Sequence, residues 1–131
     1  MANNKGIIPG TEGKLKITVK KEHTASHFGS GLIDVFATPA MIGFMEKAAQ
    51  ESIMMQLEEG FITLGTAVDI KHIKATPVGE KVTFQSVVTE VSGNKITFNV
   101  TAFDEHGQIG LGLHKRAIVH AATFIKTIAH E

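Results

Sequence analysis

The amino-acid sequence predicts an α+β fold in which a curved antiparallel β-sheet of about five strands wraps around one long helix. Residues 32–56 contain a long, almost wholly apolar stretch that includes a helix-start signal, Thr38-Pro39. Runs with the two-residue alternation of half-buried strands stand before and after it. Because the chain offers only one long helix, its apolar surface has to be buried against a sheet face.

The first strand and the helix are predicted from local patterns. Residues 14–23 alternate Leu15, Ile17 and Val19 with lysine and threonine, which is typical of a strand, and the glycine- and serine-rich residues 24–36 form a connection. Thr38 fits the N-cap and Pro39 the first helical position. The helix is expected to run to about Leu57, where Gly60 provides the stop.

A helical wheel separates the faces of this helix. The polar face carries Lys47, Glu51 and Glu58, and Glu46 falls at the edge of the apolar stripe. Phe44 lies among the polar residues, so that side is expected to be partly covered. The apolar stripe comprises Met41, Ile42, Met45, Ala48, Ala49, Ile53 and Met55.

Four further strands are predicted after the helix, within residues 61–75, 80–93, 94–107 and 109–128. Turn signals separate them, and the middle two alternate cleanly, which indicates a consecutive antiparallel meander. The whole chain, 1–131, is expected to form a single domain, with residues 1–13 as a loose leader.

Composition excludes several classes of function. The 13 basic residues balance 13 acidic ones, so the chain lacks the basic surface of a nucleic-acid-binding protein. It has no cysteine, which excludes disulfides and cysteine-ligated metals and favours a cytoplasmic location. No apolar run approaches the ~18 residues of a membrane span. The seven histidines show no metal-binding pattern, so neither a metal nor another cofactor is expected.

Glu46, His72 and Thr38 are the residues with chemical potential. Glu46 is either a solvated residue at the margin of the polar face or a carboxylate at the edge of a crevice, suited to general-base or nucleophilic work. His72 shares a strand face with Val68 and Ile70, which is typical of a core histidine but also brings a second titratable group to the apolar side. Thr38 is a plain N-cap or an orienting hydroxyl.

Three segments carry a resemblance to a known family: VFATPAMIGFMEKAA, TLGTAVDIKHIKATPVGEKVT and GLGLHKRAIV. In order and spacing, roughly residues 14–124 resemble the fluoroacetyl-CoA thioesterase family of the hotdog-fold thioesterase superfamily. The resemblance implies a hotdog fold, an active site at Thr38, Glu46 and His72, and a substrate-contacting glycine at Gly65. A single helix leaves one sheet face and the sheet edges uncovered, so a homodimer joined by sheet-edge pairing or helix packing is expected, with the active site at the subunit boundary, as the resemblance also implies.

The sequence departs from that family where the fluoroacetyl-specific member has two lid phenylalanines. Those positions are Gly29 and Leu32 here, so another acyl-CoA is expected, with Leu32 near the substrate. The run His114-Lys115-Arg116 is either a solvated charge cluster or a contact for coenzyme A phosphates, with Arg116 the candidate substrate ligand.

Three functions remain open at this stage. The first is hydrolysis of an acyl-CoA thioester to an acid and free coenzyme A. The second is a noncatalytic module that binds acyl-CoA or an acyl carrier. The third is hydration of an enoyl thioester, known in hotdog relatives that typically carry an Asp/His pair in a different motif, which this sequence lacks.

Overall fold

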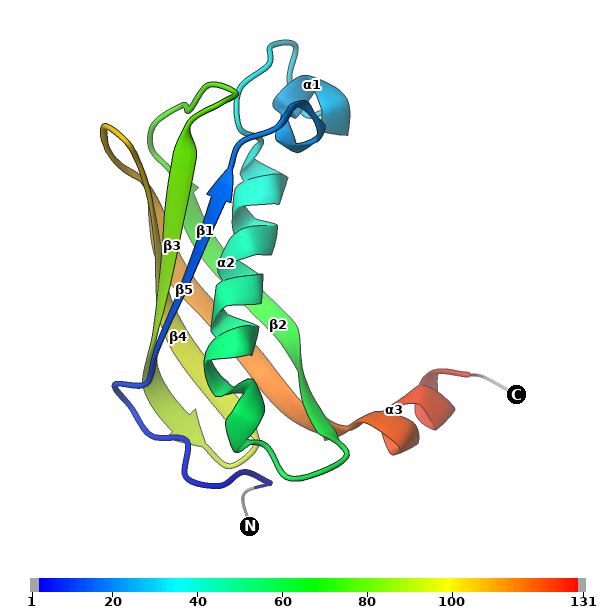
Figure 1. Ribbon diagram of the computed structural model, residues 1–131. Coiled ribbons are helices and arrows are strands. Elements are labelled where there is room, and N and C mark those ends of the chain that lie inside the picture. The colour runs from blue at the N-terminus through cyan, green and yellow to red at the C-terminus, as the bar shows by residue number, and fades with distance from the viewer. Residues whose placement is uncertain (1–2, 130–131) are drawn as a thin grey trace.

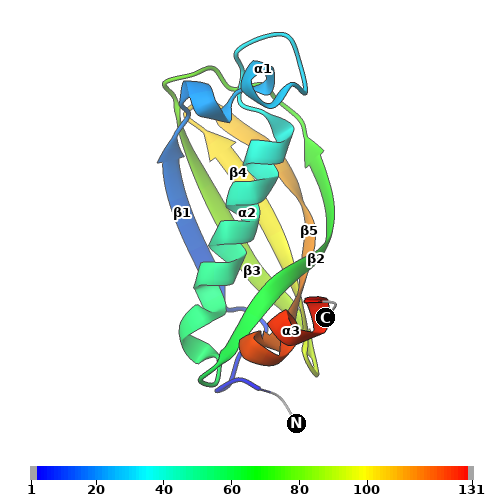
Figure 2. The ribbon, with the colours of Figure 1, turned by 90° about the vertical axis from the view of Figure 1, so that its right-hand side faces the viewer.

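The computed structural model describes residues 3–129 (Figures 1 and 2). Its elements follow in the order β1 (Glu12–Thr18), a 3-10 turn (Lys21–His23), α1 (Ala25–Phe28), α2 (Thr38–Ile53), a second 3-10 turn (Met54–Gln56), β2 (Phe61–His72), β3 (Lys81–Ser92), β4 (Lys95–Asp104), β5 (Gly107–His120) and α3 (Ala121–Ile128).

One antiparallel sheet, in the order β1-β3-β4-β5-β2, carries α2 along one face (Figures 1 and 2). The meander β3-β4-β5 is the one predicted, and β2 joins it beside β5. In the described part of the chain, β1 and β2 form the two edges of the sheet. The predicted sheet around one long helix is thereby confirmed.

The core lies between α2 and the inner face of the sheet. Alternate residues of β3 and β4 are buried as their pattern predicted, namely Val82, Phe84, Ser86 and Val88, then Ile96, Phe98, Val100 and Ala102. The apolar stripe of α2 meets them through Met41, Met45, Ala48, Ala49 and Ile53. Phe44 is also partly covered, because it packs against Phe36 and Phe84 on the side facing β3.

Three details of the helix prediction are wrong. Ala37 is the N-cap, so Thr38 is the first helical residue and its hydroxyl bonds to His72 instead of capping. The α-helix ends at Ile53 and tightens into a 3-10 turn before Leu57. Met55 therefore leaves the apolar stripe and is 87% exposed.

The predicted boundaries elsewhere also need correction. The first strand ends at Thr18, because the chain turns into the 3-10 segment at Lys21–His23. The described part of the leader is not loose, since Ile7 is buried and β1 already begins at Glu12; residues 1–2 lie outside the described part. The connection 24–36 contains α1, whose N-cap Thr24 accepts a hydrogen bond from the His27 backbone. The last predicted strand gives way to α3 after His120.

Glycines in the last strand allow close approach of its neighbours. A Cβ at Gly112 would overlap the Asp69 carbonyl oxygen and lie 2.8 Å from the Ile70 Cα. At Gly110 it would lie 2.6 Å from the Met41 sulfur. The tight β2–β5 pairing and the depth at which α2 sits both depend on the missing side chains.

Replacing Gly112 by alanine is expected to destabilise the fold by about 2–3 kcal/mol, in the upper range for overpacking, because the clashing atoms are backbone. Gly43→Ala is the matched control: this helical glycine has open space around its Cβ position, so alanine should stabilise by up to about 1 kcal/mol. Urea denaturation monitored by circular dichroism measures both changes. Equal stability of the Gly112→Ala protein and the wild type would contradict the close-approach interpretation.

Candidate functional site

Thr38 and His72 meet at the N-terminal end of α2. The Thr38 hydroxyl lies 2.8 Å from the His72 Nδ1, with the histidine supplied by the last residue of β2. Both line an open cleft of about 430 Å³, together with Val35, Phe36 and residues 73–75. The side chains of Thr38 and His72, which the sequence analysis grouped together, therefore lie side by side within one protomer.

The His72 imidazole is held neutral with one nitrogen unoccupied. Burial lowers its pKa below the ordinary value of 6.5, and the nearby Lys74 backbone only partly opposes this. The Phe36 ring packs against the imidazole edge-on, with centroids 6.5 Å apart. Within residues 3–129 its Nε2 has no hydrogen-bond partner. This nitrogen is also buried in the protomer, so it can exchange a proton with water or a bound substrate only once the residues that cover it move.

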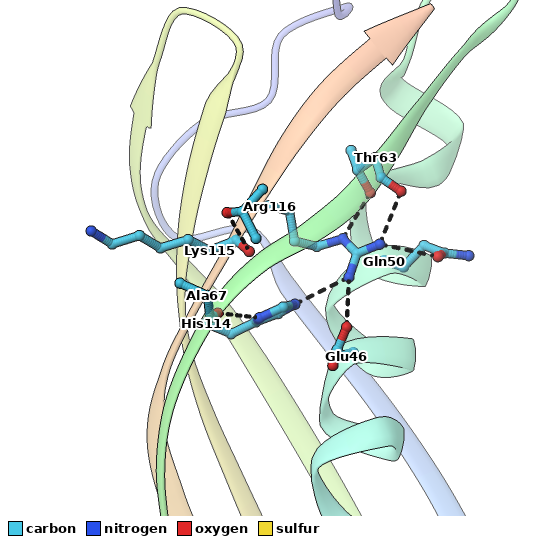
Figure 3. A network of polar contacts seen from close by, with 8 residues as sticks. Glu46, Gln50, Thr63, Ala67, His114, Lys115 and Arg116 are labelled. Atoms are coloured by element: carbon cyan, nitrogen blue, oxygen red, sulfur yellow. Dashed lines mark hydrogen bonds and ion pairs between the residues drawn. The ribbon is translucent and has the colours of Figure 1, made fainter. Parts of the chain in front are cut away.

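Glu46 lies two turns further along α2, in a second cleft of about 310 Å³ lined also by Gly65, Val68 and His114. Its side chain is 39% exposed and forms an ion pair with Arg116, Oε1 to Nη1, at 3.7 Å (Figure 3). A Cβ at Gly65 would lie 2.5 Å from that same oxygen. The carboxylate thus occupies the space that a side chain on β2 would fill, directly against the Gly65 backbone.

A β-bulge explains how β2 presents both Gly65 and His72 to the helix side. Gly65 pairs with Arg116 and His72 with Gly110, two residues on the inner face of β5, and the register shifts between Gly65 and Ala67. An uninterrupted strand would point residues seven apart to opposite faces. The extra residue resets the alternation, so that both ends of β2 contribute to the inner side.

His114 and Arg116 are buried, and their assignment to a solvated charge run was wrong. They are 1% and 4% exposed, whereas Lys115 between them points to solvent. The two-residue alternation that places Gly110, Gly112 and Ile118 on the inner face also places His114 and Arg116 there and Lys115 on the outer face. The sequence alone could therefore have distinguished the buried residues of the run from the exposed one. Sequence reasoning missed His114 because three adjacent basic residues resemble a surface cluster.

The protomer does not bring the two halves of the predicted site together. Thr38 precedes Glu46 by eight residues, which separates them by about 12 Å along the helix. The structure therefore joins Thr38 with His72 in one cleft, and Glu46 with Gly65 and His114 in another. Leu32 lies on the connection before α2 and is 97% exposed.

No three histidine or acidic side chains within residues 3–129 gather as metal ligands would. Among those same residues, no helix has the length and apolar character needed to span a bilayer.

The fold and site can now be compared with known proteins. A solved structure of the fluoroacetyl-CoA thioesterase FlK superimposes with a TM-score of 0.91 at 31% identity, covering 96% of this chain and 98% of that one. A hot-dog-like protein from Thermanaerovibrio acidaminovorans gives a TM-score of 0.84 at 27% identity, covering 92% and 89%. The protein thus has the hotdog fold of thioesterases.

Sequence similarity narrows this class to one family. A family model described as fluoroacetyl-CoA-specific thioesterase matches residues 19–122. The fluoroacetyl-CoA thioesterase of Streptantibioticus cattleyicolor is 40% identical over 91 residues, a segment that spans 70% of this chain and 66%, just under two thirds, of that relative. The chain belongs to the fluoroacetyl-CoA-specific thioesterase family.

Acid is expected to destabilise the protein between about pH 6.5 and 5. Burial lowers the pKa of both His72 and His114, and the neighbouring Arg116 charge contributes at His114. The unfolded chain, with histidine pKa values near 6.5, therefore binds more protons than the folded one, and stability is lost as pH falls below that value. Thermal melts at pH 7.5 and 5.0 measure the loss.

The pH dependence should be shallower in His114→Gln, whatever its absolute stability, because one of the two buried histidines is removed. His27→Asn is the control, since His27 is exposed on α1 and should leave the slope unchanged. A melting temperature that stays constant over this range in the wild type would contradict the assignment of neutral buried imidazoles.

Proposed function

We propose that this protein is an acyl-CoA thioesterase that hydrolyses a thioester to a carboxylic acid and free coenzyme A. The observation that carries the proposal is the Glu46 carboxylate, half-exposed in a cleft and held against the bare backbone of Gly65. A thioester carbonyl placed there meets a carboxylate beside backbone that no side chain shields. The family relationship supports the same reaction.

The residue types suit that chemistry. Glu46 either activates a water molecule for attack on the thioester carbonyl or attacks it directly to form an anhydride. Backbone N–H groups near Gly65 are suited to stabilise the oxyanion that develops. His72 is suited to polarise water or to protonate the leaving thiolate once its buried Nε2 becomes accessible in the working site, and Thr38 orients the imidazole through their 2.8 Å contact.

The acyl group that this site accepts is proposed to differ from fluoroacetyl. Gly29 and Leu32 stand where the fluoroacetyl-specific member has phenylalanines, and Leu32 is free of packing within its own protomer. A flexible aliphatic side chain at this position can contact an apolar acyl chain. It is less suited to enclosing a two-carbon acyl group closely. A cytoplasmic location, where coenzyme A thioesters are made and used, belongs to the same proposal.

A homodimer joined along β2 would complete the site. Five consecutive residues of this edge strand, 65–69, are exposed in the protomer, and open strand edges are usually paired or protected. Antiparallel pairing of two copies around an axis near Val68 brings His72 of the partner subunit toward Gly65 and Glu46. Each of the two clefts would then contribute half of one composite site.

Glu46→Gln is expected to lower kcat by at least about 100-fold, because the amide keeps the shape of the side chain but loses the charge and basicity that the reaction uses. Thiol release from a panel of acyl-CoA substrates measures the rate. Glu51→Gln is the matched control: Glu51 lies on the exposed face of α2 in a surface pair with Lys47, and its loss should leave kcat unchanged.

Two other outcomes would replace this proposal. A folded Glu46→Gln protein with wild-type turnover would remove the carboxylate from the mechanism. A wild type that binds acyl-CoA without releasing thiol would be the binding module, and a product that gains water without losing coenzyme A would identify a hydratase.

Mixing two inactive variants tests the composite site. Glu46→Gln and His72→Asn homodimers, unfolded together and refolded at equal ratio, should regain about a quarter of wild-type activity. Half of the dimers are then mixed, and each of these contains one site with both native residues. Light scattering should give twice the 14.1 kDa chain mass. Mixed dimers without regained activity would show that each site belongs to a single chain.

A further inference from the structure

Arg116 is a buried cation whose guanidinium contacts acceptors of its own chain (Figure 3). Its Nε donates to the Thr63 hydroxyl at 2.8 Å, and its Nη2 donates to the Thr63 carbonyl at 3.0 Å and to Gln50 Oε1 at 3.2 Å. Its Nη1 contacts His114 Nε2 at 3.1 Å and pairs with Glu46 at 3.7 Å. Four hydrogen bonds thus engage four of the five N–H donors of the guanidinium, and Nη1 also lies at ion-pair distance from the carboxylate. Because Arg116 is only 4% exposed, a coenzyme A phosphate could reach it only if some of these contacts were displaced.

The contacts of His114 fix its tautomer. Its Nδ1 lies 2.9 Å from the Ala67 carbonyl oxygen, which can only accept, so Nδ1 carries the proton. Its Nε2 is then an acceptor for the Arg116 Nη1–H, and the ring is neutral. The Phe98 ring stacks on its face, with centroids 6.0 Å apart, which prevents the imidazole from tilting.

The same two residues surround the Glu46 carboxylate. Ala67 is the residue at which the β2–β5 register resumes after the bulge, so the His114 bond holds the bulge that presents Gly65. The His114 ring is 3.1 Å from the position of a Cβ on Gly65, and Glu46 Oε1 is 2.5 Å from it. Arg116 reaches the carboxylate from the other side. The Gly65 backbone thus lies beside both the Glu46 carboxylate and the His114 ring, and the guanidinium pairs with the same carboxylate oxygen.

We propose that His114 and Arg116 are positioning residues that hold the Glu46 carboxylate over Gly65. His114 acts through Arg116: it accepts from Nη1 and so orients the guanidinium toward Glu46, while its other nitrogen secures the bulge. Arg116, predicted from the sequence to contact substrate, serves the carboxylate instead. This inference rests on the proposed thioesterase reaction, in which Glu46 acts on the thioester.

Two substitutions of His114 separate its two bonds. In His114→Asn the short amide reaches the place of Nδ1 and can donate to Ala67, but leaves Arg116 without its acceptor. In His114→Gln the longer amide carries its oxygen to the place of Nε2 and keeps that acceptor. Arg116→Lys keeps the charge but loses the planar fork that engages four acceptors at once. His120→Asn is the control, because His120 is exposed at the far end of β5 and asparagine is a good N-cap for α3.

The measured quantities are kcat, KM and melting temperature for each variant, with kcat expressed per folded protein. His114→Asn and Arg116→Lys should lower kcat about 10- to 100-fold with KM within about threefold, the effect of a misplaced reacting group. His114→Gln should retain more of kcat than His114→Asn at a similar melting temperature. His120→Asn should match the wild type.

Each contrary result has a distinct meaning. Equal kcat in His114→Asn and His114→Gln, or a fall in melting temperature without a fall in kcat, would make His114 purely structural and overturn the inference. A change in KM alone would make Arg116 a substrate ligand. Loss of activity in Glu46→Gln with wild-type kcat in the His114 and Arg116 variants would leave the proposed function standing without this inference. A wild type without thioesterase activity would overturn both.

Discussion

The arrangement of the site depends on one extra residue in an edge strand. β2 must direct both Gly65 and His72 toward the helix side, although residues seven apart on a regular strand point to opposite faces. The bulge between Gly65 and Ala67 resolves this conflict. Because β2 is an edge strand, the bulge disturbs its pairing with one neighbour, whereas in a central strand it would disturb two. The glycine before the bulge then lets the Glu46 carboxylate approach the backbone, so that strand geometry and site geometry have a common origin.

A buried charge imposes the second constraint. The Arg116 guanidinium cannot lose its proton, so its burial requires acceptors and a counter-ion from the surrounding residues, and the structure supplies four hydrogen-bond acceptors and one carboxylate. Thr63 and Gln50 supply neutral acceptors, and Glu46 supplies the negative charge. Because Glu46 remains 39% exposed, the pair is solvated on the carboxylate side only. The Glu46 carboxylate thereby offsets the cost of burying Arg116 and at the same time stays open to a ligand. This double role explains why the most apolar helix of the chain carries an acidic residue there.

The sequence predicted those parts of the molecule that depend on periodicity. The inner faces of β3 and β4, the apolar stripe of α2 and the placement of Glu46 at its edge all follow from alternation and the helical wheel. The prediction failed where local signals compete. Thr38 resembles an N-cap, but its hydroxyl is taken by His72 from a strand 34 residues away. Likewise Arg116 appears in a run of basic residues; strand alternation places it on the inner face, but only its contacts with Thr63 and Gln50 show how the buried charge is satisfied. Such partners are set by tertiary pairing, which one-dimensional patterns do not contain.

The free edge of the sheet and the incomplete site coincide on β2. A hotdog protomer with one helix covers only one sheet face and leaves this strand open, with residues 65–69 exposed beside the clefts of Glu46 and His72. Antiparallel pairing of two such edges would satisfy the unpaired backbone and, through the twofold symmetry, place the imidazole from one copy beside the carboxylate from the other. Neither half would then need to carry a complete reactive site before assembly. The residues that hold Glu46, in contrast, all belong to its own chain, so the carboxylate is oriented before the partner subunit arrives.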